Sequence, residues 1–402
     1  MNPAARWLIG GAAIHRLAET SYDLVMPLVV LSLTGSPVLM GLMFAVGFVA
    51  EFIVAVIGGS IVDLVSRKRL LLLITGAEVL VMAACGALAL TGSLGTVALI
   101  AAAALIDFLV RLYLVADTAA LPRVVDRQTL PRANGLMQVF VSIAQAVGPM
   151  LAGWVVGLSD VGGALLVTSG VFLLLFVSLS QIPSWGIADP AHDSATQNDV
   201  LRHMWEGVRF TFGNPLYRQI AIWRGFFDFF IGAAFLMFIF YMREELDFSG
   251  MEIGIATTMG AVGAIGGGLV FAKVQARFPS HTLITLLCAG MGVAFGVMAA
   301  AGQTWSVGLL MMSLMFLLSL LGRLLTLLFQ DTVPANLLGR VTATSQLLTT
   351  GFGPLSVLSA AWLSDVASAR HVFVIVAVAV LALAVLSRFG VMSRADWRIR
   401  LP

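Results

Sequence analysis

The chain has 402 residues, of which 59% are hydrophobic and 11% are charged, and its formal net charge is +2 at pH 7. An average soluble domain is about half apolar and about one quarter charged, so this composition excludes an ordinary water-soluble fold. Nothing in the composition supports nucleic-acid binding, and in a membrane protein the placement of the charges matters more than their sum.

Apolar runs of about 20 residues recur along the whole chain, and each is long enough to cross a hydrocarbon core about 30 Å thick. A membrane strand needs only about ten residues of alternating polarity, so these longer runs predict helices and exclude a β-barrel. The fold class is therefore an all-α membrane protein. Cuts at glycine, proline and charge clusters predict twelve spans, at residues 7–33, 37–61, 70–91, 95–119, 133–157, 163–182, 216–241, 251–272, 281–301, 305–328, 340–362 and 371–391.

The longest polar stretch, 183–215, falls between the sixth and seventh spans and predicts two six-helix bundles, 1–182 and 216–402, joined by a cytoplasmic linker. Part of this linker has a helical pattern with one apolar and one charged face. The apolar face holds Leu201, Trp205, Val208 and Phe212, and the charged face holds Arg202, Glu206 and Arg209. The pattern predicts a helix on the membrane surface or, alternatively, a linker helix packed on the cytoplasmic ends of the bundle.

Basic residues in the loops predict the orientation, because cytoplasmic loops are enriched in lysine and arginine. One side of the predicted topology has only Arg243 and Arg370. The other side holds Arg6, Arg67, Lys68, Arg69, Arg123, Arg127, Arg132, Arg202, Arg209, Arg218, Lys273, Arg277, Arg340, Arg388, Arg394, Arg398 and Arg400. We therefore expect a multi-pass protein of the bacterial inner membrane with both termini in the cytoplasm. The run that starts at Trp7 has no separate cleavage site, which predicts a retained span and not a signal peptide.

The two cysteines, Cys85 and Cys288, lie inside apolar runs, so neither disulfide nor metal chemistry is expected. The two predicted bundles also share landmarks, and internal duplication of this kind is typical of transporters. The paired landmarks are Arg111, Asp117, Thr118 and Pro122 with Arg323, Asp331, Thr332 and Pro334, and Gly148-Pro149 with Gly353-Pro354.

The loop after the second span places Gly59 four residues before Asp63, followed by the basic cluster Arg67, Lys68 and Arg69. This pattern resembles the loop signature of the major facilitator superfamily, and the resemblance covers essentially the whole chain. It implies two pseudo-symmetric six-helix bundles and a cytoplasmic gate formed by these residues. The counterpart after the eighth span keeps two basic residues, Lys273 and Arg277, but lacks the acid.

The fifth predicted span has Ala144, Gly148, Pro149, Ala152 and Gly153, which resembles the antiporter motif of exporters in this superfamily. Small residues at every fourth position permit close helix contact, and a proline bends or stiffens the helix. Pure helix packing is the alternative interpretation. The stretch from Leu121 to Leu136 is similar to siderophore exporters and macrolide efflux proteins, although lysophospholipid transporters share its Ala-Asn-Gly-Leu segment.

Ionisable residues inside the predicted spans are the main candidates for function, because an Asp, Lys or Arg at a helix centre costs roughly 2.5–3.5 kcal/mol. The resemblance implies that spans one, four, seven and ten line a central cavity. These four spans contain His15, Arg16, Glu19, Asp23, Asp107, Arg111, Arg224, Asp228 and Arg323. Two further acids, Glu51 and Glu78, lie in spans two and three; Glu51 fits a gate or a helix interface, and we favour a structural role for Glu78.

Helical spacing groups these charges. His15, Glu19 and Asp23 share one stripe, and a desolvated carboxyl there could take up a proton near neutral pH. The i, i+4 pairs Asp107–Arg111 and Arg224–Asp228 are either functional or neutralised structural pairs. Arg111 occupies the place where the superfamily has an arginine associated with proton coupling. Many methionines, with Phe226, Phe227, Phe229 and Phe230, suit a deformable apolar pocket or ordinary core packing.

We therefore expect a secondary transporter, namely a proton-coupled antiporter that exports a small amphipathic molecule such as a siderophore, drug or other secondary metabolite by alternating access. Its partners would be that molecule, protons and the lipid bilayer; it would act as a monomer without a cofactor, driven by the proton gradient. The alternatives are a lysophospholipid or nutrient transporter of the same fold, or a non-transporting membrane receptor. No phosphate-binding loop, nucleophile elbow or metal-spaced His/Cys set predicts an enzyme.

Overall fold

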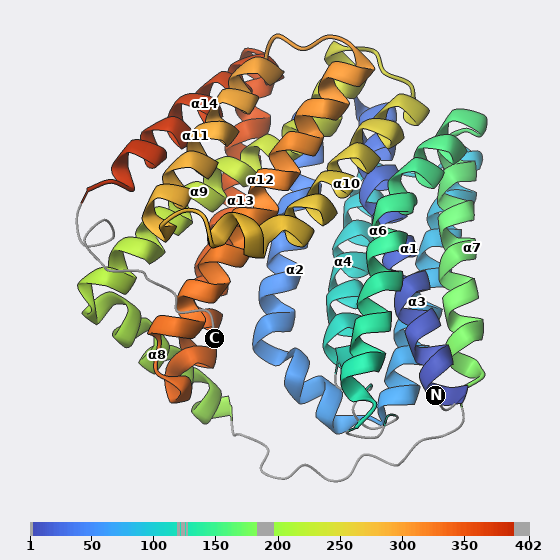
Figure 1. The fold of residues 1–402 in the computed structure, drawn as a ribbon. Helices are drawn as coiled ribbons and strands as arrows, with labels where there is room; N and C mark the ends of the chain where they lie inside the picture. The colour runs from blue at the N-terminus through green and yellow to red at the C-terminus, as the bar shows by residue number, and fades with distance from the viewer. Residues whose placement is uncertain (1–2, 119–120, 122–124, 126–127, 183–196, 390–402) are drawn as a thin grey trace. The chain divides into compact units, whose positions relative to one another are not determined.

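The computed structural model describes residues 3–118, 121, 125, 128–182 and 197–389, and within them every regular element is a helix (Figure 1). Twelve helices in this described part are long and apolar enough to cross a membrane. The predicted all-α membrane fold is therefore confirmed. Some of the residues named above lie outside the described part of the chain: Pro122, Arg123, Arg127, Arg394, Arg398 and Arg400, and the side chains of Asp63, Thr118, Leu201, Arg202 and Arg340.

Contacts divide the chain into two units, one formed by residues 1–194 and 247–258 and the other by residues 195–246 and 259–402. The first unit contains α1 (Pro3–Thr34), α2 (Pro37–Leu64), α3 (Arg67–Leu90), α4 (Thr96–Thr118), α6 (Leu130–Leu158) and α7 (Val161–Ser180). The second contains α8 (Gln197–Gly213), α9 (Pro215–Phe240), the π-helical turn η1 (Tyr241–Glu245), α11 (Ser280–Met298), α12 (Thr304–Thr332), α13 (Ala335–Val366) and α14 (Ala369–Leu386). Helix α10 (Gly250–Gln275) is divided between the two units after Thr258.

Several helices begin where the sequence has a capping residue followed by proline. Ser36 precedes Pro37 at the start of α2, and its side chain accepts a hydrogen bond from the backbone N–H of Leu39. Asn214 precedes Pro215 at the start of α9 and accepts from Leu216 in the same way. A capping side chain satisfies an N–H that has no partner inside the helix, and proline fits the first helical position.

The core of the first unit is built around α1, which packs against α6 and α7, while α3 packs against α7 and α2 against α4. In the second unit α9 packs against α13 and α14, and α11 packs against α12 and α14. An aromatic cluster joins three of these helices: Phe238 lies 5.4 Å from Phe373 and 6.1 Å from Phe295, between ring centroids. These contacts fix the helices that carry the candidate functional residues.

Helix α8 occupies the predicted amphipathic segment and packs on α13 and α9. Among its described side chains, Thr211 is buried, whereas Trp205 and Arg209 are exposed. The helix therefore contacts the second unit through one face and leaves an aromatic and a basic side chain accessible on another.

Candidate functional site

A cavity of about 100 Å³ lies among α1, α2 and α4 of the first unit, and we call it the acidic pocket. Four of the predicted ionisable residues line it together: Asp23, Glu51, Asp107 and Arg111. The rest of the lining consists of Tyr22, Met26, Pro27, Met43, Phe44, Gly47 and Phe48. The pocket therefore brings three carboxyl groups and one guanidinium into a mainly apolar surrounding.

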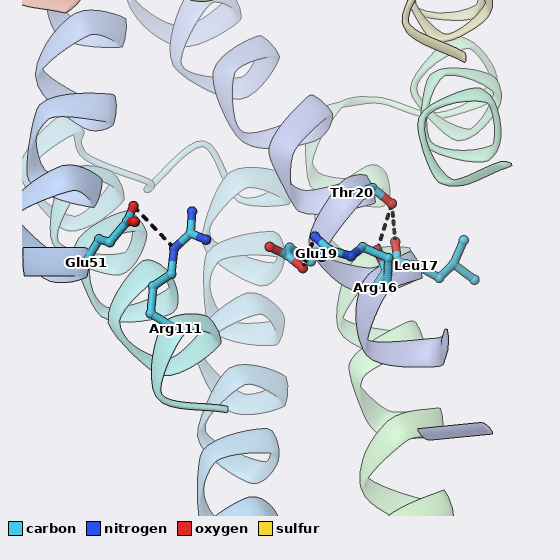
Figure 2. A network of polar contacts seen from close by, with 6 residues as sticks. All are labelled: Arg16, Leu17, Glu19, Thr20, Glu51 and Arg111. Atoms are coloured by element: carbon cyan, nitrogen blue, oxygen red, sulfur yellow. Dashed lines mark hydrogen bonds and ion pairs between the residues drawn. The ribbon is translucent and has the colours of Figure 1, made fainter. Parts of the chain in front are cut away.

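Arg111 forms its ion pair with a residue of another helix and not with Asp107 on its own helix. Its Nε lies 3.7 Å from a carboxylate oxygen of Glu51 on α2, as Figure 2 shows. Asp107, one turn before Arg111, instead lies against Gly47, where a Cβ atom would overlap its carboxylate. The Tyr22 hydroxyl donates a hydrogen bond of 3.3 Å to the carbonyl of Ala103, one turn before Asp107. Glu51 is thus joined to Arg111, and Asp23 and Asp107 have no ion-pair partner among the described residues.

The expected stripe of His15, Glu19 and Asp23 separates into three environments. Asp23 is exposed and lines the acidic pocket. Glu19 is 4% exposed and accepts a hydrogen bond of 2.8 Å from Arg16, whose side chain is 28% exposed (Figure 2). His15 is buried and stacks on Tyr113, with ring centroids 3.7 Å apart. Each step of four residues advances about 40° beyond a full helical turn, so positions eight residues apart point in clearly different directions.

In the second unit Arg224 and Asp228 form the expected i, i+4 ion pair on α9. Arg323 of α12 is exposed and lies against Gly268 of α10, where a Cβ atom would stand 2.6 Å from its guanidinium. No acid pairs with Arg323 among the described residues. The two landmark arginines of the duplicated pattern, Arg111 and Arg323, therefore have different surroundings.

A second cavity, of about 390 Å³, lies among α8, α9 and α13, and we call it the aromatic pocket. Its lining is Phe212, Ala221, Ile222, Gly225, Phe226, Phe229, Phe230, Phe352 and Leu355. Phe227 does not take part, because it is buried and stacks on Trp223. The contributions of Phe352 and Leu355 were not foreseen, since residues far apart in sequence meet here only through packing of α9 on α13.

In this structure, one residue of the loop signature, Lys68, contacts the end of another helix. Lys68, at the start of α3, donates hydrogen bonds to the backbone carbonyls of Ser180, at 3.3 Å, and of Ile182 at the end of α7. A cation at a helix C-terminus satisfies carbonyls that lack an intrahelical partner and interacts favourably with the helix dipole. Gly59 has open space around its Cα, and Arg69 is exposed. Arg67 is partly buried.

The glycines of the fifth span permit close approach of other helices, as the small-residue pattern predicts. A Cβ atom at Gly148 would overlap the hydroxyl of Thr20 on α1. Gly153 lies against the backbone of Gly250 and Gly254, within the same unit. Pro149 stands inside α6 between these contacts.

The described residues contain no group of three or more His, Cys, Asp or Glu side chains that could hold a metal ion. Sequence reasoning missed Tyr22 and Tyr113 as members of the polar clusters. Neither tyrosine is charged, so a search for ionisable residues in spans passes over them. The signal present in the sequence is an acid close to each of them, since Tyr113 precedes Asp117 by four residues, about one helical turn, and Tyr22 directly precedes Asp23.

Comparison with known proteins agrees with this architecture. The sequence model of the Major Facilitator Superfamily matches residues 8–356. The enterobactin exporter EntS of Shigella boydii serotype 4 (strain Sb227) is 24% identical over 342 residues, which cover 85% of this chain and 80% of the relative. The EntS protein of Escherichia coli O81 (strain ED1a) has the same identity and coverage.

Solved structures of low sequence identity share the fold. The nucleoside transporter NupG superposes with a TM-score of 0.75 at 13% identity and covers all of both chains. A bacterial homologue of the iron transporter ferroportin, in an inward-facing state, gives 0.72 at 16% identity, over 96% of this chain and 97% of the other. With a family match over most of the chain and the twelve spanning helices, the protein is a multi-pass inner-membrane transporter, not an enzyme, and it belongs to the major facilitator superfamily.

Proposed function

We propose that the protein is a proton-coupled exporter of a small amphipathic molecule, working as a monomer with both termini and the linker in the cytoplasm. The observation that carries this proposal is the surplus of acid in the acidic pocket. Three carboxyl groups face one arginine, and that arginine already pairs with Glu51. Neither Asp23 nor Asp107 forms an ion pair among the described residues, in spans where an unpaired charge is costly. Binding a proton removes that cost.

The cargo contacts an apolar lining in this proposal. The aromatic pocket offers Phe226, Phe229, Phe230 and Phe352, whose rings suit an aromatic or branched apolar group. An amphipathic molecule carries such a group beside its polar ones. A siderophore, drug or other secondary metabolite belongs to this class.

Two observations support export as the direction of transport. The relatives named enterobactin exporter share 24% identity with this chain over most of its length. The motif around Gly148, Pro149 and Gly153 holds α6 in close contact with its neighbours. Exchange of cargo against protons then uses alternating access.

The test is transport by purified protein in liposomes, after a thermal-shift screen with enterobactin, a macrolide and a lysophospholipid has selected a cargo. We expect an imposed proton gradient to drive the selected cargo against its own gradient, and dissipation of the proton gradient to stop this. Cargo movement that is equal with and without the gradient contradicts proton coupling. Flux in the import direction favours a nutrient or lysophospholipid transporter, and binding without counterflow favours a receptor.

A further inference from the structure

Several buried polar side chains in the described part of the first unit lack a hydrogen-bond partner. Four of the residues concerned lie on α1, α3 and α4, namely His15 (Nε2), Glu78 (both carboxyl oxygens), Tyr113 (hydroxyl) and Asp117 (Oδ1). All four residues are at most 6% exposed. Most buried polar groups in native proteins are hydrogen bonded, so four unpaired ones in one bundle require a reason.

These groups are neighbours. The His15 ring stacks on Tyr113 with an angle of 8° between the ring planes. Tyr113 interacts electrostatically with both Glu78 and Asp117, and Glu78 interacts with Glu19. Glu19 in turn interacts with Asp23 of the acidic pocket. These groups therefore lie within electrostatic range of one another, from Asp23 in the pocket, by way of Glu19 and Glu78, to Asp117 in the last turn of α4.

No cation neutralises Glu78 within this series. The groups that face it are Glu19 from α1 and Tyr113 from α4, and α7, which packs on α3, has no ionisable residue between Val161 and Ser180. The basic residues of α3 itself, Arg67 to Arg69, lie about two and a half turns away at its start. A fully buried carboxylate without a counter-charge is strongly unfavourable, so Glu78 is held as the neutral acid.

We propose that His15, Glu78, Tyr113 and Asp117 line a buried, water-bridged path that carries protons between Glu19 and the Asp117 end of α4, apart from the pocket that binds cargo. Buried water bonds to otherwise unpaired polar groups and bridges them. This inference rests on the proposed proton coupling and adds its route. It also gives Glu78, for which the sequence favours a structural role, a part in transport.

The transfer step is simple. The O–H bond of the Glu78 acid breaks, its electron pair stays on that carboxylate, and an O–H bond forms on the carboxylate of Glu19 through the bridging water. Glu19 then loses its charge and its ion pair with Arg16, the partly exposed guanidinium 2.8 Å away. A proton moving from the Asp117 end of the path restores the acid at Glu78. Arrival of a proton at Glu19 thereby breaks the ion pair with Arg16. The freed guanidinium couples proton movement along the path to the rest of the transporter.

A cargo-free experiment tests the path independently of transport. In infrared spectra of the purified protein, we expect a carbonyl band of a buried carboxylic acid that is absent from Glu78→Gln. We expect this band to shift in D₂O as its proton exchanges, and Tyr113→Phe, which keeps the ring stacked on His15, to slow the exchange about tenfold or more. Asp365→Asn, at an exposed acid on α13, serves as the control and should change neither the band nor its exchange.

Absence of a Glu78-dependent band, or exchange at the wild-type rate in Tyr113→Phe, overturns the path. If Glu78→Gln does not fold, the exchange rate in Tyr113→Phe decides alone. In liposomes, Glu78→Gln should lose about tenfold or more of its proton-driven enterobactin transport while cargo counterflow, which needs no net proton movement, stays within about twofold. Proton-driven transport at the wild-type rate overturns the path but leaves the proposed function intact. A wild-type protein without any proton dependence refutes the proposed function instead, and the infrared result still stands.

Discussion

The two units carry related helices but opposite kinds of pocket. In the first unit, α1, α2 and α4 surround a small cavity with three carboxyl groups and one arginine. In the second, α8, α9 and α13 surround a larger cavity lined by aromatic and aliphatic side chains, and the charged residues Arg224 and Asp228 form an ion pair with each other on α9. Duplication of a helical pattern therefore does not duplicate its chemistry. Our proposal accordingly places proton binding in the first unit and apolar cargo contacts in the second.

The largest effect is expected from neutralising the unpaired acids of the first unit. Asp23→Asn combined with Asp107→Asn should lower proton-driven transport by about a hundredfold, because neither side chain can then take up or release a proton. The matched control is Arg224→Gln combined with Asp228→Asn, which removes a charge-balanced ion pair from the second unit. Transport assays in liposomes with an imposed proton gradient compare the two. Equal losses of proton-driven transport in both double variants would contradict the proposal that the first unit binds the protons.

Substitution of the two landmark arginines should also lower proton-driven transport more in the first unit, at Arg111, than in the second, at Arg323. Arg111→Gln leaves Glu51 without its cation beside two further acids, so proton-driven transport should fall about tenfold. Arg323→Gln removes a cation that has no acidic partner among the described residues, and its effect should stay within about threefold. Initial rates of proton-driven transport, measured side by side for the two variants, give the ratio of their losses. A larger loss in Arg323→Gln than in Arg111→Gln would mean that the second unit holds the more important charge.

Aromatic side chains of the second unit should govern affinity for cargo. Phe352→Ala removes one ring from the aromatic pocket and should weaken cargo binding about tenfold, close to 1.4 kcal/mol, without altering the dependence on the proton gradient. Trp362→Ala on the same helix, at a residue 64% exposed and outside the pocket lining, is the control. Titration calorimetry or fluorescence of the purified protein measures both. Unchanged affinity in Phe352→Ala would exclude this pocket from cargo binding.

The smallest effect is expected at the helix-end contact of the loop signature. Lys68→Met removes two hydrogen bonds to the end of α7 and should reduce stability by less than about 1 kcal/mol. A lowered melting temperature with an unchanged proton dependence is the expected result. If proton-driven transport falls steeply while the melting temperature stays the same, Lys68 acts in a gate and not only as a helix cap.

Much of this arrangement could be predicted from the sequence, and the remainder depends on packing between distant segments. Run length and hydropathy predict the spans, and the chemical cost of charge in a bilayer identifies Asp23, Glu51, Asp107 and Arg111 as candidates. Local spacing alone suggested Asp107 as the partner of Arg111, whereas packing of α2 on α4 brings Glu51 to it. The pairing required knowledge of which helices touch.

Two further features escaped prediction for related reasons. Of the stripe of His15, Glu19 and Asp23, only Asp23 lines the pocket, because four residues exceed one helical turn, and His15 stacks on Tyr113 instead. Phe352 and Leu355 complete the aromatic pocket from a helix more than one hundred residues away in sequence. Short-range patterns identify the residues of a site but do not determine how helices close around it.

The most direct measurement of the central claim is proton movement caused by cargo. Liposomes containing the purified protein and a pH-sensitive dye are given a gradient of the selected cargo and no proton gradient. We predict that cargo moving down its gradient drives protons the opposite way, that Asp23→Asn with Asp107→Asn abolishes this proton flux, and that Arg224→Gln with Asp228→Asn leaves it in place. Cargo transport by the wild-type protein without any accompanying proton flux would contradict the account.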